Sequence, residues 1–272
     1  MKKIHALTLS LLSLTLMGCL EGRKNTEQLC ADNPALKCER LNMDDGQCRL
    51  PRTDLIWHRF EVIKNPTPKN RIQEYELVAE YKKCLELASQ IQAIDQTELK
   101  QRRFKALVNS GEDLETIVGV LSQSKSPEAL YFLWSRVGNE DARRSFLQLE
   151  GTSQLDTADM QYALATFYTS RDQHKTRQLL LRALELTNQN NINNEVFKSL
   201  ASTTYRLKQR EEAYIWAMVA SEFDVPIATE SELQLLYGFD DGKYKQLQLI
   251  ADQLKEAIEK GTFTKEMVPK FK

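Results

Sequence analysis

The sequence predicts an all-α protein in which a right-handed α-solenoid of helix-turn-helix repeats follows an irregular, disulfide-stapled N-terminal segment. Two consecutive helical hairpins can be read between Asp156 and Asp224, with apolar residues at helical spacing in each helix. Only ten Gly and seven Pro occur in 272 residues, which disfavours sandwiches and barrels because short strands need frequent turn formers. All five cysteines lie at or before Cys84, so covalent staples are expected in the first part of the chain.

Residues 1–18 have the composition of a secretory signal peptide. Two lysines precede an apolar run over 6–17, which is too short to remain as a membrane span. The end of this region, Leu16-Met17-Gly18-Cys19, resembles a bacterial lipobox, in which the cysteine thiol takes a diacylglycerol group. We therefore expect lipidation of Cys19; the alternative is cleavage by an ordinary peptidase, with Cys19 in a disulfide. By resemblance to other bacterial lipoproteins, Leu20 favours transfer to the outer membrane.

The lipid on Cys19 is expected to make the membrane the first partner of this chain. Each buried acyl CH₂ contributes about 0.8 kcal/mol, so several chains on one cysteine hold a protein firmly. After Cys19 no apolar run approaches the ~20 residues that cross a bilayer. The predicted location is therefore the outer membrane, with the body of the protein facing the periplasm.

Residues 19–70 are expected to form an irregular, cysteine-bearing segment next to the lipid anchor. Four thiols remain after Cys19, and an even number in an oxidising compartment predicts two disulfides with three possible connectivities. A helix predicted over about 72–94 turns Cys84 inward, so a bridge to it would pin the segment and stabilise the fold by ~3 kcal/mol. The favoured pairing joins Cys30 to Cys38 and Cys48 to Cys84. A zinc site is the disfavoured alternative, because these spacings contain no C-x₂-C pair.

Residues 71–260 are predicted to form the helical repeat domain. One stripe of apolar residues indicates a short helix that ends at Gly111, and it consists of Phe104, Leu107 and Val108. Ser126 and Pro127 are typical of a helix start, because Ser caps free amides and Pro at the first helical position loses no hydrogen bond. Gly138 is expected to end that helix.

The two central hairpins have the clearest periodicity. Their predicted inward faces consist of Met160, Ala163, Leu164, Phe167, Leu179, Leu180, Ala183, Leu184, Val196, Phe197, Leu200, Ala201, Ala213, Trp216, Ala217 and Ala220. Because 213–220 is unbroken apolar sequence, this helix is expected at the centre of the stack. Thr229 and Glu232 fit a capping box, and a last amphipathic helix is predicted over 243–260. The C-terminal tail, 261–272, is expected to fray, or to fold back through its apolar residues Phe263, Met267 and Val268.

Several stretches resemble a known family. They are Asp45-Gly46-Gln47-Cys48-Arg49, the run from Pro51 to Arg59, the run from Glu128 to Trp134, the run from Gln161 to Thr166 and the run from Ala213 to Ala220. In these stretches the chain is similar to the bacterial lipoprotein family called domain of unknown function 2989, which implies no particular activity. The second hairpin also resembles Sel-like and tetratricopeptide repeats, although Lys208 replaces the usual turn glycine and Arg177 stands where alanine is typical.

Residues that would carry chemistry are scarce. The predicted mature chain has two histidines, His58 and His174, and no nucleophile, metalloprotease or phosphate-loop motif, so no catalytic residue, cofactor or metal is predicted. A formal charge of −1 disfavours nucleic acid as a partner, since binding to phosphates needs an excess of Lys and Arg. Four tyrosines are expected to pack between helices or to line a peptide groove, and these are Tyr162, Tyr168, Tyr205 and Tyr214.

The sequence as a whole indicates a lipoprotein whose specific function is not encoded in a motif. A repeat domain without catalytic motifs favours a periplasm-facing scaffold for protein–protein interaction at the cell envelope. The alternative is a cell-wall-active hydrolase, in which two of the 38 acidic residues would supply the paired carboxyl groups of glycoside cleavage.

Overall fold

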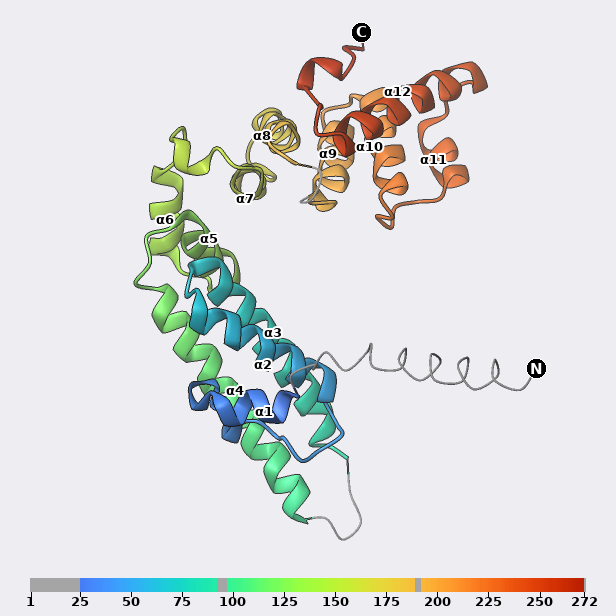
Figure 1. Cartoon of the computed structure of the whole chain (residues 1–272). Helices are drawn as coiled ribbons and strands as arrows, with labels where there is room; N and C mark the ends of the chain where they lie inside the picture. The colour runs from blue at the N-terminus through green and yellow to red at the C-terminus, as the bar shows by residue number, and fades with distance from the viewer. Residues whose placement is uncertain (1–24, 92–96, 189–191, 272) are drawn as a thin grey trace, which may run out of the picture. The chain divides into compact units, whose positions relative to one another are not determined.

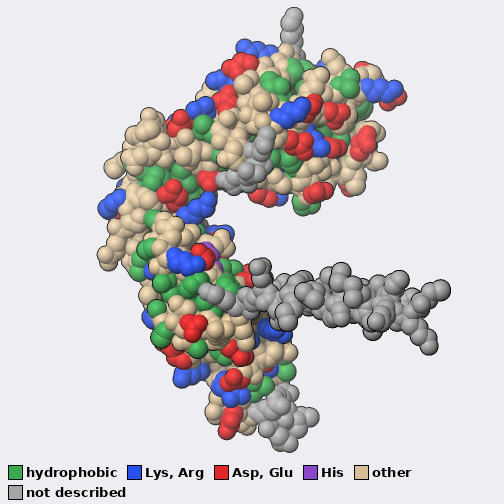
Figure 2. Space-filling view, viewed as in Figure 1, with side chains coloured by type: hydrophobic (Ala, Val, Ile, Leu, Met, Phe, Trp, Pro, Cys, Tyr) green, Lys and Arg blue, Asp and Glu red, His purple; other side chains and the backbone are tan. Residues whose placement is uncertain are grey.

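The computed structural model describes residues 25–91, 97–188 and 192–271, and the part of the chain that it describes is helical, with no β-strand (Figure 1). The predicted signal peptide over 1–18 and the predicted lipidation site Cys19 lie outside the described residues. The chain divides into two compact units, 1–124 and 125–272, so the boundary predicted after residue 70 lies within the first unit. None of the helices described is long and apolar enough to cross a membrane. On the face that Figure 2 shows, charged side chains of both signs and hydrophobic ones are interspersed.

Unit 1 contains four α-helices and two short 3₁₀ helices among its described residues. The elements are α1 (Thr26–Asp32), η1 (Pro34–Leu36), η2 (Cys38–Arg40), α2 (Arg49–Lys64), α3 (Pro68–Ala88) and α4 (Thr97–Leu121). Helix α3 packs between α2 and α4, while α1 and η1 lie against α2 and η2 lies against α4. The cysteine-bearing segment and the two long helices α3 and α4 therefore belong to one compact unit.

Helix α2 corrects the prediction that 19–70 is irregular. Its buried face recurs at helical spacing and consists of Arg52, Leu55, Ile56, Arg59 and Val62. Two of these five positions are arginines, so the apolar period cannot be seen in the sequence. Arg59 is accommodated in the core because its Nη2 bonds to Asp113 and its Nε lies 3.3 Å from Glu74 Oε1.

Helix α4 corrects the prediction of a short helix that ends at Gly111. The helix runs through Gly111 to Leu121 and is 25 residues long in all. Gly111 does not have the positive φ of a helix-ending glycine and is tolerated in the helix interior. The predicted inward residues Phe104 and Val108 are 60% and 46% exposed. The buried side is instead turned toward Arg103, Ala106 and Ser110.

Unit 2 contains eight α-helices and two 3₁₀ helices among its described residues. The elements are α5 (Pro127–Val137), α6 (Glu140–Gln148), η3 (Ser153–Leu155), α7 (Ala158–Tyr168), α8 (Gln173–Glu185), α9 (Glu195–Arg206), α10 (Arg210–Glu222), α11 (Glu230–Tyr237), α12 (Asp241–Glu259) and η4 (Lys265–Met267). Consecutive helices pack on each other from α7 to α10, and α12 packs on α10. The two hairpins predicted between Asp156 and Asp224 are therefore present as α7–α8 and α9–α10.

The ends of these helices follow the sequence signals. The Ser126 side chain accepts from the amide of Ala129, and Gly138 ends α5 with φ at 77°. Thr229 and Glu232 form the predicted capping box at the start of α11. Lys208, at the turn between α9 and α10, has a φ of 62°. A side chain thus occupies the left-handed conformation that glycine would adopt most easily.

Helix α10 is the centre of unit 2, as its unbroken apolar sequence predicts. All nine residues from Glu212 to Ala220 are buried, and Trp216 is fully enclosed. The C-terminal segment returns over this core instead of fraying. Phe263 and Val268 are 5% and 6% exposed, while Met267 remains 39% exposed. Burial of these two apolar side chains offsets part of the entropy lost by ordering the segment.

Candidate functional site: a charged groove beside the C-terminal segment

Two adjoining cavities in unit 2 form a groove along the C-terminal segment. The first, about 740 Å³, lies between one face of α8 and residues 265–270. The second, about 480 Å³, lies between the start of α8, the turn that leads into α10, and residues 269–271. Both are lined by Arg177, Pro269 and Lys270, so they adjoin at these residues. We call the two cavities together the charged groove.

The C-terminal segment is held in place from α12 onward and forms one wall of the groove. Gly261 turns the chain out of α12 with φ at 65°, and the Thr262 amide donates to the Ala257 carbonyl. Phe263 then packs edge-on against Trp216, with ring centroids 6.1 Å apart. The Lys265 amide donates to Glu185 Oε1 on α8 at 3.0 Å. The wall is therefore fixed by aromatic packing and by a hydrogen bond between two residues that are 80 positions apart in the sequence.

Two arginines of α8 have carboxylate partners that anchor the opposite wall. Arg177 donates from Nε and Nη2 to Glu212 at 2.8 and 2.9 Å, and Glu212 also accepts from the Trp216 indole. Arg182 makes an equivalent two-bond contact with Asp156. The hydrogen bonds from Arg182 lower the pKa of Asp156, because they favour its ionised form. The charges of these two arginines are already neutralised by the fold.

Three lysines of the groove are different. Lys208, Lys265 and Lys270 line the cavities, and among the described residues no carboxylate pairs with their ammonium groups. Among the described residues, Glu266 is the one carboxylate lining the groove that has no ion-pair or hydrogen-bond partner. Three free cations against one free anion give the groove a local positive potential, although the whole chain carries a formal charge of −1. The groove can therefore attract a ligand that carries several negative charges.

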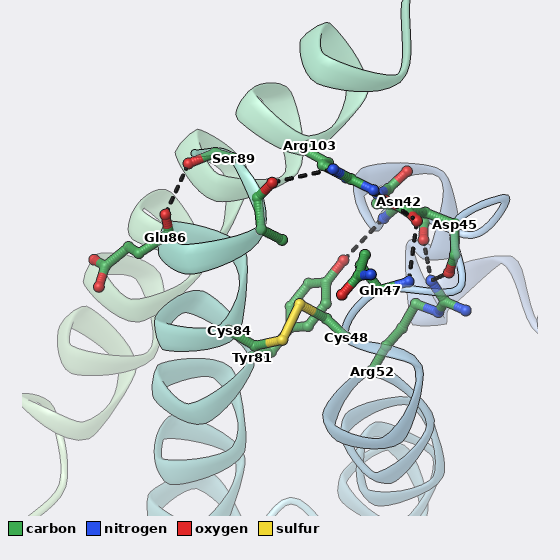
Figure 3. The surroundings of a disulfide bond; sticks show 11 residues. Asn42, Asp45, Gln47, Cys48, Arg52, Tyr81, Cys84, Glu86, Ser89 and Arg103 are labelled. Atoms are coloured by element: carbon green, nitrogen blue, oxygen red, sulfur yellow. Dashed lines mark hydrogen bonds and ion pairs between the residues drawn. A yellow bond between two sulfur atoms is a disulfide. The ribbon is translucent and has the colours of Figure 1, made fainter. Parts of the chain in front are cut away.

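The predicted disulfide cysteines lie in unit 1 and are joined in the favoured pairing. Cys30 and Cys38 are bonded with 5.9 Å between Cα atoms, and Cys48 and Cys84 with 5.7 Å. Both distances are usual for a disulfide. The second bridge connects the start of α2 to α3 and so attaches the cysteine-bearing segment to the first long helix (Figure 3).

Buried polar contacts surround this second disulfide (Figure 3). Asp45 accepts from Arg103 Nε at 2.5 Å and from Arg103 Nη2 at 3.1 Å, and Arg103 also donates to the Ala88 carbonyl. The bonds from Arg103 hold the pKa of Asp45 below its usual range. The Tyr81 hydroxyl accepts from the Asn42 amide at 2.9 Å, and burial raises the pKa of this tyrosine. The cluster orders the loop before α2.

The two histidines of the predicted mature chain, His58 and His174, do not form one site. His58 Nε2 lies 2.8 Å from the Asn70 carbonyl oxygen, a contact that joins α2 to α3. His174 is exposed at the start of α8. No group of three or more His, Cys, Asp or Glu within the described ranges is arranged to hold a metal.

The four tyrosines proposed for a peptide groove mostly serve packing. Tyr168 donates to Glu150 at 2.7 Å and interacts with Lys175 at 3.0 Å. Tyr214 is buried and packs edge-on against Tyr237, whose pKa burial raises to about 12. Tyr205 is 47% exposed and also packs against Tyr237, and Tyr162 is half-buried on α7. The cavities of the groove are lined by none of these rings.

Among the described residues, four carboxyl groups have a clearly lowered pKa, and each is held ionised by hydrogen bonds. They are Asp45, Asp156, Glu232 and Glu256. The general acid of glycoside cleavage needs the opposite, a raised pKa that keeps its proton near neutral pH. These four residues are therefore unsuited to that role in the hydrolase alternative.

The groove was not predicted from the sequence. In the sequence, Arg177 and Lys208 stand out only as departures from a repeat pattern, and Lys265 and Lys270 belong to a tail expected to fray. The available signal was the pair of apolar residues Phe263 and Val268, whose burial brings the tail lysines to α8.

Comparison with known protein families gives a match over most of the chain. A family model described as protein of unknown function (DUF2989) matches residues 16–218. No curated protein and no solved structure matches the chain.

Proposed function

The chain belongs to the DUF2989 family of proteins of unknown function, and we propose that it is a lipid-anchored envelope scaffold whose charged groove binds an acidic segment of another protein. The observation that supports this proposal is the set of free ammonium groups on Lys208, Lys265 and Lys270. A charged groove that is not neutralised by its own fold favours a partner of opposite charge, both in the rate of encounter and in specificity.

The helical hairpins supply a rigid support for such a groove. In this proposal α7–α8 and α9–α10 are two degenerate repeats of the Sel-like or tetratricopeptide type, wound as a right-handed solenoid. Repeat arrays of this kind present extended surfaces for protein recognition. The packing of α8 on α9 and of α12 on α10 supports the stacked arrangement.

The proposed location follows from the amino terminus. Residues 1–18 are removed as a signal peptide, Cys19 receives the lipid, and Leu20 directs the protein to the outer membrane with its body in the periplasm. The two disulfides support an oxidising compartment, since such bonds persist in the periplasm and are rare in the cytosol. Mass spectrometry of the N-terminal peptide from purified envelopes tests the lipid directly.

Partner capture tests the groove. A photoreactive residue at Gln178, which lines the larger cavity, is expected to crosslink a defined protein in living cells. The double charge reversal Lys208→Glu and Lys270→Glu should remove that crosslink. The matched control is Lys245→Glu, an exposed lysine of α12 that lies outside the lining of both cavities. Equal crosslinking in all three proteins would contradict the proposal.

A further inference from the structure

Unit 1 carries a group of unusually exposed large apolar side chains. Leu50 is 76% exposed at the start of α2, and Leu87 is 66% exposed near the end of α3. Ile91 and Phe104 follow at 45% and 60%. We call these four residues the apolar end. Apolar surface of this kind costs free energy in water and in soluble proteins often marks a contact site.

The four residues belong to one end of the helical unit. Leu50 lies two residues after Cys48, which is bonded to Cys84 on α3. Cys84 lies about one helical turn before Leu87, so the start of α2 is close to the end of α3. Arg103 Nη1 donates to the Ala88 carbonyl at 3.1 Å, so Phe104 also lies near the end of α3. In Figure 1 the end of α3 and the start of α4 lie together at the lower end of unit 1.

The described chain begins close to the same end. A cavity of about 450 Å³ is lined both by Glu27 and Cys30 of the first helix and by Arg102 and Lys105, which flank Phe104 on α4. Asn25 caps that first helix. Cys19 precedes it by six residues, and six residues span at most ~20 Å even when fully extended. A lipid on Cys19 would therefore hold this end of unit 1 near the membrane surface.

The exposed charges that flank Phe104 on α4 suit a membrane that contains anionic lipid. They are Lys100, Arg102 and Lys105, against the acid Glu98. Elsewhere around the apolar end, exposed acids outnumber exposed bases: Glu27, Glu39, Asp44 and Glu86 against Arg49 and Lys83. Basic residues near a membrane surface are attracted by its negative potential, while neighbouring apolar side chains enter the headgroup boundary.

We propose that the apolar end is a membrane-contact surface that inserts Phe104, Leu87, Leu50 and Ile91 into the periplasm-facing leaflet to which the lipid is attached. The inference rests on the proposed function only for the position of the lipid at Cys19. It goes beyond that function, because it gives the protein a second attachment point and hence a fixed orientation of unit 1 on the membrane.

The test supplies the anchor chemically, so that it does not depend on lipidation in the cell. The mature chain from Cys19 onward is purified without lipid and its Cys19 thiol, the one left outside the two disulfides, is coupled to a maleimide-bearing phospholipid in phosphatidylethanolamine–phosphatidylglycerol vesicles. Phe104→Trp reports insertion through quenching by brominated acyl chains. Val120→Trp, at a valine that is 50% exposed near the opposite end of the same helix α4, is the matched control.

The expected result is that brominated lipid quenches the fluorescence added by Phe104→Trp and leaves that added by Val120→Trp unchanged. The uncoupled protein should also float with the vesicles, and Phe104→Ser or Leu87→Ser should weaken that binding about tenfold each. Absence of quenching in the coupled protein would overturn the inference. So would an in-cell photocrosslink from Leu87 to a protein in place of lipid. Failure of Cys19 lipidation in cells would instead overturn the proposed anchor and leave the vesicle result standing.

Discussion

Replacing Asp45 with Ala is expected to destabilise unit 1 by about 3–5 kcal/mol, because it leaves the Arg103 guanidinium buried without its counter-charge. Both side chains are 6% exposed, so water cannot take the place of the missing carboxylate. Arg103 would lose two of its three hydrogen bonds and keep the one to Ala88. The Asn42 side chain and the Gln47 amide would lose their acceptor as well.

Replacing both partners separates the loss of the pair from the cost of leaving one charge unpaired. Asp45→Ala combined with Arg103→Met removes both charges, and we expect it to cost less than Asp45→Ala alone. The matched control is Glu61→Gln, which breaks an exposed ion pair with Lys64 in the same unit and should change stability by less than about 0.5 kcal/mol.

Native-state hydrogen exchange shows which of the two compact units loses stability. Asp45→Ala should lower the protection of amides in α2, α3 and α4 and leave those in α10 unchanged, because the pair belongs to unit 1. Urea unfolding of the oxidised protein gives the free energy. A loss below about 1 kcal/mol would refute the reasoning that this buried pair orders the loop before α2.

Three further predictions follow from the same contacts. The pKa of Asp45 lies below its usual value of 3.8. Its ionised form therefore stabilises unit 1 above pH 3.8, and this stabilisation is lost as the pH falls through the lowered pKa of the folded state. Acid unfolding of unit 1, followed as a function of pH, should become less steep in Asp45→Asn. Removing the Cys48–Cys84 bridge, which spans 36 residues, should cost about 3.8 kcal/mol by loop entropy, against about 2.5 kcal/mol for the 8-residue Cys30–Cys38 bridge, as measured by denaturant unfolding of the double alanine variants. Phe263→Ala should cost about 3–5 kcal/mol in unit 2 and release the C-terminal segment to proteolysis; a segment that stays resistant would show that Phe263 does not hold it.

The helices of unit 2 are largely predictable because their patterns are local. The run from Ala213 to Ala220 is apolar throughout, and a helix of that composition must be buried on all sides. The Ser126 cap, the Gly138 stop and the Thr229–Glu232 capping box each depend on two or three neighbouring residues. The inward position of Cys84 also follows from one local helix and favours a bridge to the earlier segment, but the helix does not decide which of the other three cysteines is the partner.

Unit 1 is less predictable because its core contains charges. Arg52, Arg59 and Arg103 occupy inward positions and are satisfied by acceptors from other elements, so the apolar period of α2 and α4 is broken. This is why Phe104 was expected inside and lies outside. The groove is harder still, since Lys208 and Lys270 come together only after the C-terminal segment has folded back on α10.

An in-cell photocrosslink from Gln178 in the groove, followed by mass spectrometry of the captured peptide, shows whether the groove binds an acidic segment. We expect one partner, captured through a stretch rich in Asp and Glu, and lost in the Lys208→Glu and Lys270→Glu variant while Lys245→Glu retains it. A captured peptide without acidic residues, or a crosslink that survives the charge reversal, would contradict the proposed function.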